Sequence, residues 1–265
     1  MKLGFIGCGN MATAMISGMI NNRIVEATDI IASDASSKAL KDAEEKLGIL
    51  TSTDNLAVAT SVDVLFLSVK PQYYETVIKE IAQDIWKSTI IVTIAAGQSL
   101  KRVESLFERT LKLIRTMPNT PALVSEGITA VCRNDQVTDD EFSLVMNLLR
   151  GFGIAEEVPE HLMDAVVAVS GSSPAYVFIL IEAMADAAVA EGMPRDKAYR
   201  FAAQAVLGSA KMVLETGKHP GALKDMVCSP GGTTIDAVQS LEKTGFRSSI
   251  MEAMKVCADK SRKLS

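Results

Sequence analysis

Hydrophobic positions in the first part of the chain alternate between short apolar runs and helix-like segments. Apolar runs lie at residues 2–6, 29–33, 62–69, 89–94 and 111–115, and the stretch 127–132 alternates less clearly. Continuous runs of this kind are typical of strands buried on both faces of a parallel sheet. After the first run, Met11, Met15 and Met19 recur at helical spacing, and a polar helix is expected to end near Leu47. The pattern predicts repeated strand–helix units, and therefore an α/β domain.

The pattern changes after residue 158, where strand-like runs stop and long helical patterns begin. The expected helices cover residues 173–191, 195–215, 233–243 and 247–264. The linker at Val158-Pro159 is therefore a predicted domain boundary. It separates an α/β domain over residues 1–158 from an all-α domain over residues 159–265.

The first of these helices is unusually apolar. Between Ala175 and Ala190 its only charged residues are Glu182 and Asp186, four positions apart on one narrow stripe. A helix that is apolar around most of its circumference must be covered nearly all round, which predicts that a second subunit completes this domain. The alternative is a central helix in a monomeric bundle. A membrane span is not expected, because the apolar run from Ala175 ends at Glu182.

Composition and charge exclude several classes of function. The formal net charge is −5 and no long run of Lys or Arg occurs, so binding to nucleic acid or to a membrane surface is not expected. Four scattered cysteines fit reduced thiols and a cytoplasmic location. The two histidines, His161 and His219, lie far apart, so no metal site is predicted. The apolar stretch from Leu3 to Cys8 is too short for a secretory signal.

A glycine-rich segment follows the first predicted strand and opens the first predicted helix. Residues 7–12 read Gly-Cys-Gly-Asn-Met-Ala, which is the G-x-G-x-x-A pattern of dinucleotide-binding loops. Gly7 would allow the tight turn, Gly9 would let a pyrophosphate approach the backbone, and Ala12 would permit close packing of helix and strand. The alternative is a glycine-rich turn without a ligand. The methionine stripe is interpreted as core packing.

The end of the second predicted strand gives conflicting signals about the cofactor. Asp34 is placed to hydrogen-bond the ribose 2′-OH of NAD. Ser36, Ser37 and Lys38 follow at once and could instead hold the 2′-phosphate of NADP. Ser36 could also be simply a helix N-cap. The sequence leaves the choice between NADPH and NADH open.

Two further loops fall at the ends of predicted strands, where ligands bind in open α/β sheets. One contains Ser68, Val69, Lys70 and Pro71, and the other covers residues 94–97. Each could be a structural turn by itself. Together with the glycine loop they outline one crevice.

The most distinctive motif lies in the second half of the chain, where residues 228–234 read Cys-Ser-Pro-Gly-Gly-Thr-Thr. Thr233 followed by Asp236 is interpreted as a capping box that starts a helix. Two glycines before a helix expose backbone N–H groups, a geometry suited to a carboxylate. An ordinary glycine-rich helix entry explains the same residues equally well.

Over essentially its full length the chain resembles the pyrroline-5-carboxylate reductase family. The matching stretches are residues 4–11, 69–71, 95–97, 117–121, 169–176 and 219–235, of which the Ser-Pro-Gly-Gly-Thr-Thr run is the most specific. The resemblance implies a Rossmann domain followed by a helical dimerisation domain, with active sites shared between subunits. It also implies reduction of 1-pyrroline-5-carboxylate to L-proline, the last step of proline biosynthesis, with NADPH or NADH. Family members form homodimers and larger rings, up to decamers.

The resemblance assigns roles to particular residues. Thr234 would lie near the ring nitrogen as the catalytic residue. The substrate would be bound by Glu160, Ser229, Gly231, Gly232, Thr233 and Thr234. Together with the glycine-loop reasoning, it gives the expected cofactor site as Ile6, Gly7, Cys8, Gly9, Asn10, Met11, Asp34, Ser36, Asn55, Ser68, Val69, Lys70, Pro71, Ile94, Ala95 and Ala96. Some family members carry a small neutral residue in place of Asp34, which bears on NADPH preference.

The residues that are missing agree with imine chemistry. A protonated imine already carries positive charge, so hydride can add without a strong general acid, whereas a ketone needs a proton donor. No lysine occurs between Lys112 and Lys197, the region where related hydroxyacid dehydrogenases carry theirs. His161 and His219 are interpreted as surface or capping residues. The alternatives are a reductase of another cyclic imine or of a 2-hydroxy acid, and a nucleotide sensor without turnover.

Overall fold

The computed structural model describes residues 1–263, which form two compact units. The sheet unit comprises Met1–Ser172 together with the described residues from Cys257 onward, and the helical unit is Ser173–Val256. By contacts, the chain therefore divides after Ser172, whereas its sequence pattern changes at Val158-Pro159. The segment between the two points packs with the sheet unit, as the fully buried Met163 shows. The sequence-based boundary remains a prediction.

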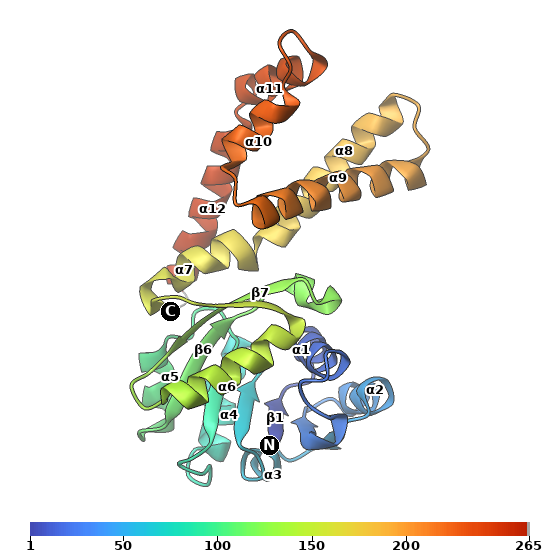
Figure 1. Ribbon diagram of the computed structural model, residues 1–265. Coiled ribbons are helices and arrows are strands. Elements are labelled where there is room, and N and C mark those ends of the chain that lie inside the picture. The colour runs from blue at the N-terminus through green and yellow to red at the C-terminus, as the bar shows by residue number, and fades with distance from the viewer. Residues whose placement is uncertain (264–265) are drawn as a thin grey trace. The chain divides into compact units, whose positions relative to one another are not determined.

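The sheet unit is built on eight strands in the order β3-β2-β1-β4-β5-β6-β7-β8 (Figure 1). All neighbouring strands are parallel except β6 and β7. The strand bounds are β1 Leu3–Ile6, β2 Ile30–Ser33, β3 Leu50–Ser52, β4 Val64–Leu67, β5 Ile90–Thr93, β6 Lys112–Met117, β7 Gly127–Arg133 and β8 Gly153–Glu157. The predicted α/β Rossmann architecture is confirmed for this part of the chain.

Alternating residues of the central strands supply two cores, one on each face of the sheet. Phe5 and Phe66 stack on one face with their ring centroids 4.6 Å apart. This face is covered by α1 (Asn10–Asn21), α2 (Ser37–Leu47) and α6 (Asp139–Leu149); the other is covered by α3 (Asn55–Ala59), α4 (Tyr74–Ile81) and α5 (Leu100–Phe107). Met15 and Met19 are fully buried in the first core, which confirms that the methionine stripe packs.

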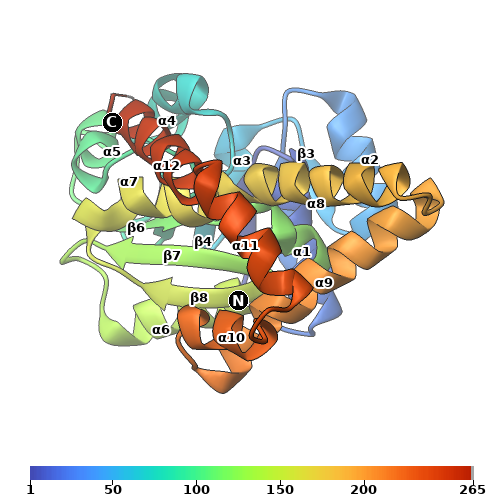
Figure 2. The ribbon, with the colours of Figure 1, turned by 90° about the horizontal axis from the view of Figure 1, so that it is seen from above.

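The pattern of apolar runs did not predict two of the strands or the antiparallel direction of a third. β3 and β8 contain only one buried residue, Ala155, so they leave no apolar run in the sequence. β7 runs antiparallel to β6 because only a short 3-10 turn, Thr120–Val124, joins them, and a parallel pair needs a longer crossover. Figure 2 shows β7 and β8 side by side, as their parallel register requires.

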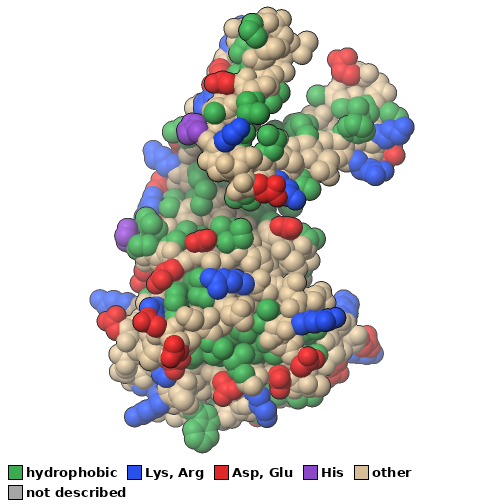
Figure 3. Space-filling view, viewed as in Figure 1, with side chains coloured by type: hydrophobic (Ala, Val, Ile, Leu, Met, Phe, Trp, Pro, Cys, Tyr) green, Lys and Arg blue, Asp and Glu red, His purple; other side chains and the backbone are tan. Residues whose placement is uncertain are grey.

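The helical unit contains α8 (Ser173–Ala190), α9 (Arg195–Thr216), α10 (Pro220–Val227), α11 (Thr233–Lys243) and most of α12 (Phe246–Arg262). The helices at α8, α9, α11 and α12 match the predicted ones within a residue or two, and α10 was missed. Helices α8 and α9 pack together, yet the buried apolar side chains of this unit are three alanines. Large apolar side chains remain exposed along the helices (Figure 3), for example Phe201 at 68% and Leu214 at 73%.

The continuous helix Glu160–Ala190 passes the length and composition test for a membrane-spanning helix. Only 11% of its apolar stretch is buried within the described chain. The apolar run considered in the sequence, which ends at Glu182, is too short to cross a membrane. The whole helix Glu160–Ala190 is long enough. The same properties are expected of a helix that a second subunit covers.

Candidate cofactor and substrate sites

A pocket of about 350 Å³ opens at the ends of β1, β2 and β4. In the sheet, β1 lies between β2 and β4. The strands that follow β1 in sequence are therefore added first on one side of it and then on the other, so the strand order reverses at β1. Ligands of open α/β sheets bind at such a switch point. The residues that line the pocket are Ile6, Gly7, Gly9, Asp34, Ala35, Asn55, Ser68, Val69, Lys70, Tyr73, Thr76 and Val77.

The glycine loop has the shape that close approach of a ligand requires. Gly7 has φ +104°, and a side chain there would come within 2.8 Å of the Ser68 carbonyl oxygen. A Cβ on Gly9 would meet no atom within 4 Å, so this position faces open space. Gly9 is also the N-cap of α1 and offers no side-chain acceptor. The first N–H groups of α1 are therefore available to an anion.

Two polar residues fix the walls of the pocket. The Ser68 hydroxyl lies 2.9 Å from the Gly7 carbonyl oxygen and 3.1 Å from that of Ile6, which ties the loop after β4 to the end of β1. Asn55 accepts a hydrogen bond from the Ser33 hydroxyl at 2.7 Å and donates one to Glu80 at 2.8 Å. Its amide therefore has a defined orientation at the pocket edge.

Asp34 continues the pocket wall at the end of β2, and Ser36 lies just beyond the lining. One carboxylate oxygen of Asp34 accepts the Cys8 N–H at 2.8 Å, and the other accepts the Ser36 N–H at 2.8 Å. The Ser36 hydroxyl accepts the Ala39 N–H and caps α2. The capping interpretation of Ser36 is thus confirmed, whereas a contact with the cofactor remains a prediction.

The thiol of Cys8 is not a candidate nucleophile. Burial, together with the smaller effect of the nearby Asp34 carboxylate, raises its pKa from 9.0 to about 12. The thiol therefore stays protonated near neutral pH. It points toward the Ser33 carbonyl oxygen at 3.7 Å, which makes it part of the packing below the glycine loop.

Several predicted cofactor residues lie outside this pocket lining: Cys8, Asn10, Met11, Ser36, Pro71, Ile94, Ala95 and Ala96. Residues 94–96 follow β5, the strand beside β4, so they border the same end of the sheet. The sequence reasoning missed Ala35, Tyr73, Thr76 and Val77. The last three lie in the turn and the first part of α4, just after Lys70-Pro71. A helix predicted to start after that loop would have placed them near the pocket.

Glu160 is engaged within the sheet unit. Its carboxylate accepts the Leu100 N–H at 2.7 Å and an Arg115 N–H at 2.8 Å. It therefore interacts with the start of α5, where backbone N–H groups lack helical partners, and neutralises a guanidinium that is almost fully buried. Its proposed position beside the substrate remains a prediction.

The glycine-rich loop of the helical unit forms a tight turn before α11. The Gly232 N–H donates to the Ser229 carbonyl oxygen at 3.1 Å, and Gly231 adopts φ +65°. The predicted capping box of Thr233 and Asp236 is wrong. The N-cap is Gly232 and Thr233 is already the first helical residue, so the Thr233 side chain is not at the N-cap position.

This correction leaves the start of α11 without a side-chain cap. Its first backbone N–H groups are therefore open to an external acceptor such as a carboxylate. The hydroxyl of Thr234, which is partly buried, makes no hydrogen bond within residues 1–263. His219 accepts the Gly221 N–H and caps α10, and His161 lies on the surface, as predicted.

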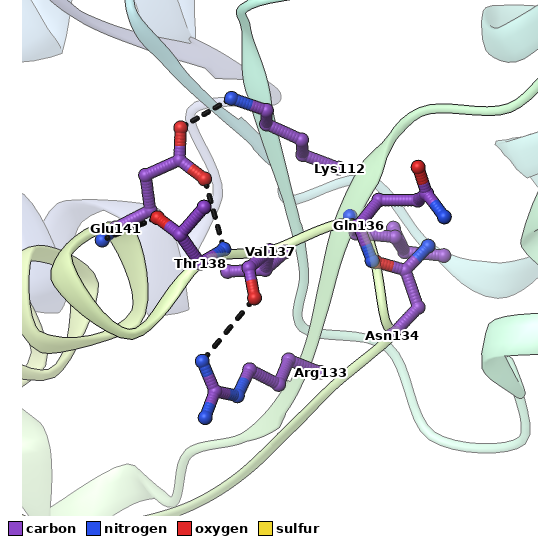
Figure 4. Close-up of polar contacts among 8 residues, drawn as sticks. Lys112, Arg133, Asn134, Gln136, Val137, Thr138 and Glu141 are labelled. Carbon is purple, nitrogen blue, oxygen red and sulfur yellow. Dashed lines mark hydrogen bonds and ion pairs between the residues drawn. The ribbon is translucent and has the colours of Figure 1, made fainter.

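A second polar cluster, shown in Figure 4, lies around the turn that follows β7. Lys112 pairs with Glu141, while Thr138 and Glu141 form the capping box of α6. Arg133 donates to the Val137 carbonyl oxygen at 3.2 Å and also pairs with Asp139. These groups satisfy one another, which is typical of a structural network. In the described part of the chain, no group of acidic, His and Cys side chains is arranged to hold a metal ion.

Comparisons with known proteins point in one direction for both units. Residues 160–264 match the family described as pyrroline-5-carboxylate reductase dimerisation, and residues 2–97 match the family described as NADP oxidoreductase coenzyme F420-dependent. The chain is similar to the pyrroline-5-carboxylate reductase of Escherichia coli K12, with 51% identity across 100% of this chain and 98% of the relative. It is 44% identical to that of Methanosarcina acetivorans, covering 99% and 97%.

The fold is also similar to a solved structure. The crystal structure of Plasmodium falciparum pyrroline carboxylate reductase, which has NADP bound, superposes with a TM-score of 0.91 at 31% identity. The match covers 99% of this chain and 97% of the other. Because the match spans nearly the whole chain, it includes both units.

Proposed function

The chain belongs to the pyrroline-5-carboxylate reductase family, and from this membership we propose how its residues bind the cofactor and the substrate. The enzyme reduces 1-pyrroline-5-carboxylate to L-proline, the last step of proline biosynthesis, with NADPH or NADH. The observation that carries the proposal is the pocket at the switch point, which gathers the glycine loop, Asp34, Asn55 and the Ser68–Lys70 loop.

In this proposal the cofactor lies across the ends of β1, β2 and β4. The uncapped start of α1 would hold its pyrophosphate, and Gly9 would leave room for it. When bound, the nicotinamide supplies the hydride. The remaining contacts are assigned to the other predicted cofactor residues: Ile6, Gly7, Cys8, Asn10, Met11, Asp34, Ser36, Asn55, Ser68, Val69, Lys70, Pro71, Ile94, Ala95 and Ala96.

The substrate carboxylate is assigned to the turn of residues 229–233 and the open N–H groups at the start of α11. The absence of a side-chain cap there supports the assignment. The hydroxyl of Thr234 is assigned to the ring nitrogen, because it is partly buried and makes no hydrogen bond within the described chain. Glu160 is assigned a bordering position.

The proposed chemistry depends on orientation. The substrate's protonated imine carries the positive charge that attracts hydride, so these residues need to hold the ring rather than donate a proton to a developing alkoxide. Thr234 would fix the ring nitrogen, and the loop would fix the carboxylate. Together the two contacts would limit how the ring can be oriented toward the hydride donor.

The enzyme is a homo-oligomer. In this proposal a second subunit packs on the exposed apolar side chains of the helical unit. The basic assembly is a dimer, and dimers can join into a larger ring such as a decamer. The second subunit would bury the apolar surface of α8, so a membrane is not required to cover this helix. The enzyme is proposed to act in the cytoplasm without a nucleic-acid partner, consistent with its net charge of −5.

Replacement of Thr234 by alanine tests the substrate site. We expect turnover of pyrroline-5-carboxylate to fall roughly ten- to a thousand-fold, the scale for losing one orienting hydrogen bond in a dry site. Cofactor affinity and the thermal midpoint should hardly change. Thr244→Ala is the matched control, because its hydroxyl only bonds carbonyl groups within the same helix.

Open-chain 2-keto acids should be poor substrates for the wild type, since no lysine occurs between Lys112 and Lys197 to donate a proton. Comparable rates on keto acids would contradict the proposed imine chemistry. Near-native catalytic efficiency of folded Thr234→Ala would remove this hydroxyl from the site.

A further inference from the structure

The carboxylate of Asp34 is held rigidly in the wall of the cofactor pocket. Asp34 is the first residue after β2, and its two oxygens accept backbone N–H groups on opposite sides, from Cys8 in the glycine loop and from Ser36 before α2. Cys8 is only 7% exposed. Rotating the carboxylate out of the pocket would therefore leave a largely buried N–H group without a partner, which is unfavourable.

The same geometry leaves the carboxylate able to bind a sugar hydroxyl. An ionised carboxylate has about four acceptor positions, and the two backbone N–H groups use one on each oxygen. The free positions can accept the hydroxyl groups of a ribose. A phosphate in place of the 2′-hydroxyl would instead bring negative charge against the carboxylate.

Nothing that lines the pocket near Asp34 would compensate that repulsion. Among the described lining residues the only cationic side chain is Lys70. It follows β4, which is separated from β2 by β1, so its strand lies roughly 10 Å across the sheet. Ser36, whose hydroxyl accepts the Ala39 N–H and caps α2, and Lys38 are not among the lining residues.

We propose that Asp34 makes this enzyme prefer NADH to NADPH by accepting the ribose 2′-hydroxyl and repelling a 2′-phosphate. The inference rests on the cofactor site proposed above. It adds a selection between the two cofactors that neither the family nor the NADP-bound relative assigns to this chain.

The test uses a pair of probes that differ only at the 2′ position: AMP and adenosine 2′,5′-bisphosphate. Their affinities for the full-length enzyme are measured by calorimetry, together with those of NAD⁺ and NADP⁺. We expect the wild type to bind the member without the 2′-phosphate at least about tenfold more tightly in each pair. Asp34→Asn and Asp34→Ser should reduce that ratio at least about tenfold.

Asp42→Asn is the matched control. It removes a carboxylate from α2, and Asp42 does not line the pocket. Its affinity ratio should equal that of the wild type. Thermal midpoints check that each variant is folded. Because asparagine has nearly the same shape as aspartate, Asp34→Asn keeps the test valid if Asp34→Ser disturbs the loop.

The outcomes separate the two levels of the proposal. If the wild type binds both members of each pair equally, or if the ratio is unchanged in folded Asp34→Asn and Asp34→Ser, the inference about Asp34 is overturned while the cofactor site stands. If NADH and NADPH compete with none of these probes, the proposed cofactor site itself fails.

Discussion

The two units of this chain solve the problem of apolar burial differently. The sheet unit buries large side chains on both faces of its sheet, including Phe5, Phe66, Phe107 and Phe152. The buried apolar residues of the helical unit are Ala185, Ala198 and Ala202, while Phe178 and Ile179 remain more than half exposed. One unit is completed by its own chain, and we infer that a second copy completes the other.

This difference separates the two proposed halves of the chemistry. The pocket for the cofactor is built by backbone and side chains of a unit with its own cores. The loop proposed for the substrate carboxylate belongs to the unit that lacks one. Assembly is therefore expected to matter more for substrate turnover than for binding of the cofactor.

The largest expected effect comes from placing a charge on the exposed apolar surface of α8. Ile179→Asp would bury an unpaired carboxylate at each contact between copies, which costs several kcal/mol. We expect the subunit dissociation constant to rise at least about a thousand-fold, because a symmetric dimer contains the substitution twice. Light scattering across a dilution series measures this.

Leu144→Asp on α6 provides the matched control, since Leu144 is an exposed leucine of the sheet unit at 39%. It should leave the mass unchanged. If Ile179→Asp keeps the wild-type mass, or if Leu144→Asp dissociates the assembly equally, the helical unit does not carry the contact between copies.

A smaller effect is expected in the core of the sheet unit. Phe66 is fully buried and stacks on Phe5, so Phe66→Ala should lower the free energy of unfolding by about 3–5 kcal/mol. Urea unfolding measures the loss. Phe178 is 61% exposed, and the same truncation there is expected to remove proposed contacts between copies. Its effect should vanish in protein dilute enough to dissociate, whereas that of Phe66→Ala should remain.

The smallest effect concerns the two buried thiols of the sheet unit. Burial raises the pKa of Cys8 and of Cys132 from 9.0 to about 12. Because the folded pKa lies above the unfolded one, the unfolded state loses these protons first as pH rises. The stability associated with them is fully present below pH 9 and is lost between about pH 9 and pH 12.

Replacing both thiols by alanine should therefore reduce the decrease in the free energy of unfolding at alkaline pH. At pH 10 the reduction should be roughly 1 kcal/mol per thiol. Urea midpoints at pH 7, 8 and 10 measure it. The double variant and the wild type should differ by a constant amount between pH 7 and pH 8, which is the internal control. Parallel curves up to pH 10 would show that the thiols titrate normally.

Local sequence determined much of the fold and of the candidate site. The glycine loop and the Ser68–Lys70 loop were predicted from a motif and from strand ends, and Asn55 from the family resemblance. They line one pocket because parallel strands place their carboxyl ends together. The apolar runs predicted six of the eight strands, since burial on both faces leaves a continuous signal. Strands β3 and β8 left none, because only one of their residues, Ala155, is buried.

The sequence by itself thus determined the α/β unit, its glycine loop and the need of α8 for a cover, because periodicity and turn residues record local conformation and burial. Tertiary structure decided what depends on distance between remote segments. It directed the carboxylate of Asp34 to the Cys8 N–H, 26 residues away, and joined Glu160 to Arg115 across 45. Such pairings follow from how the strands and helices pack, which no local pattern of residues encodes.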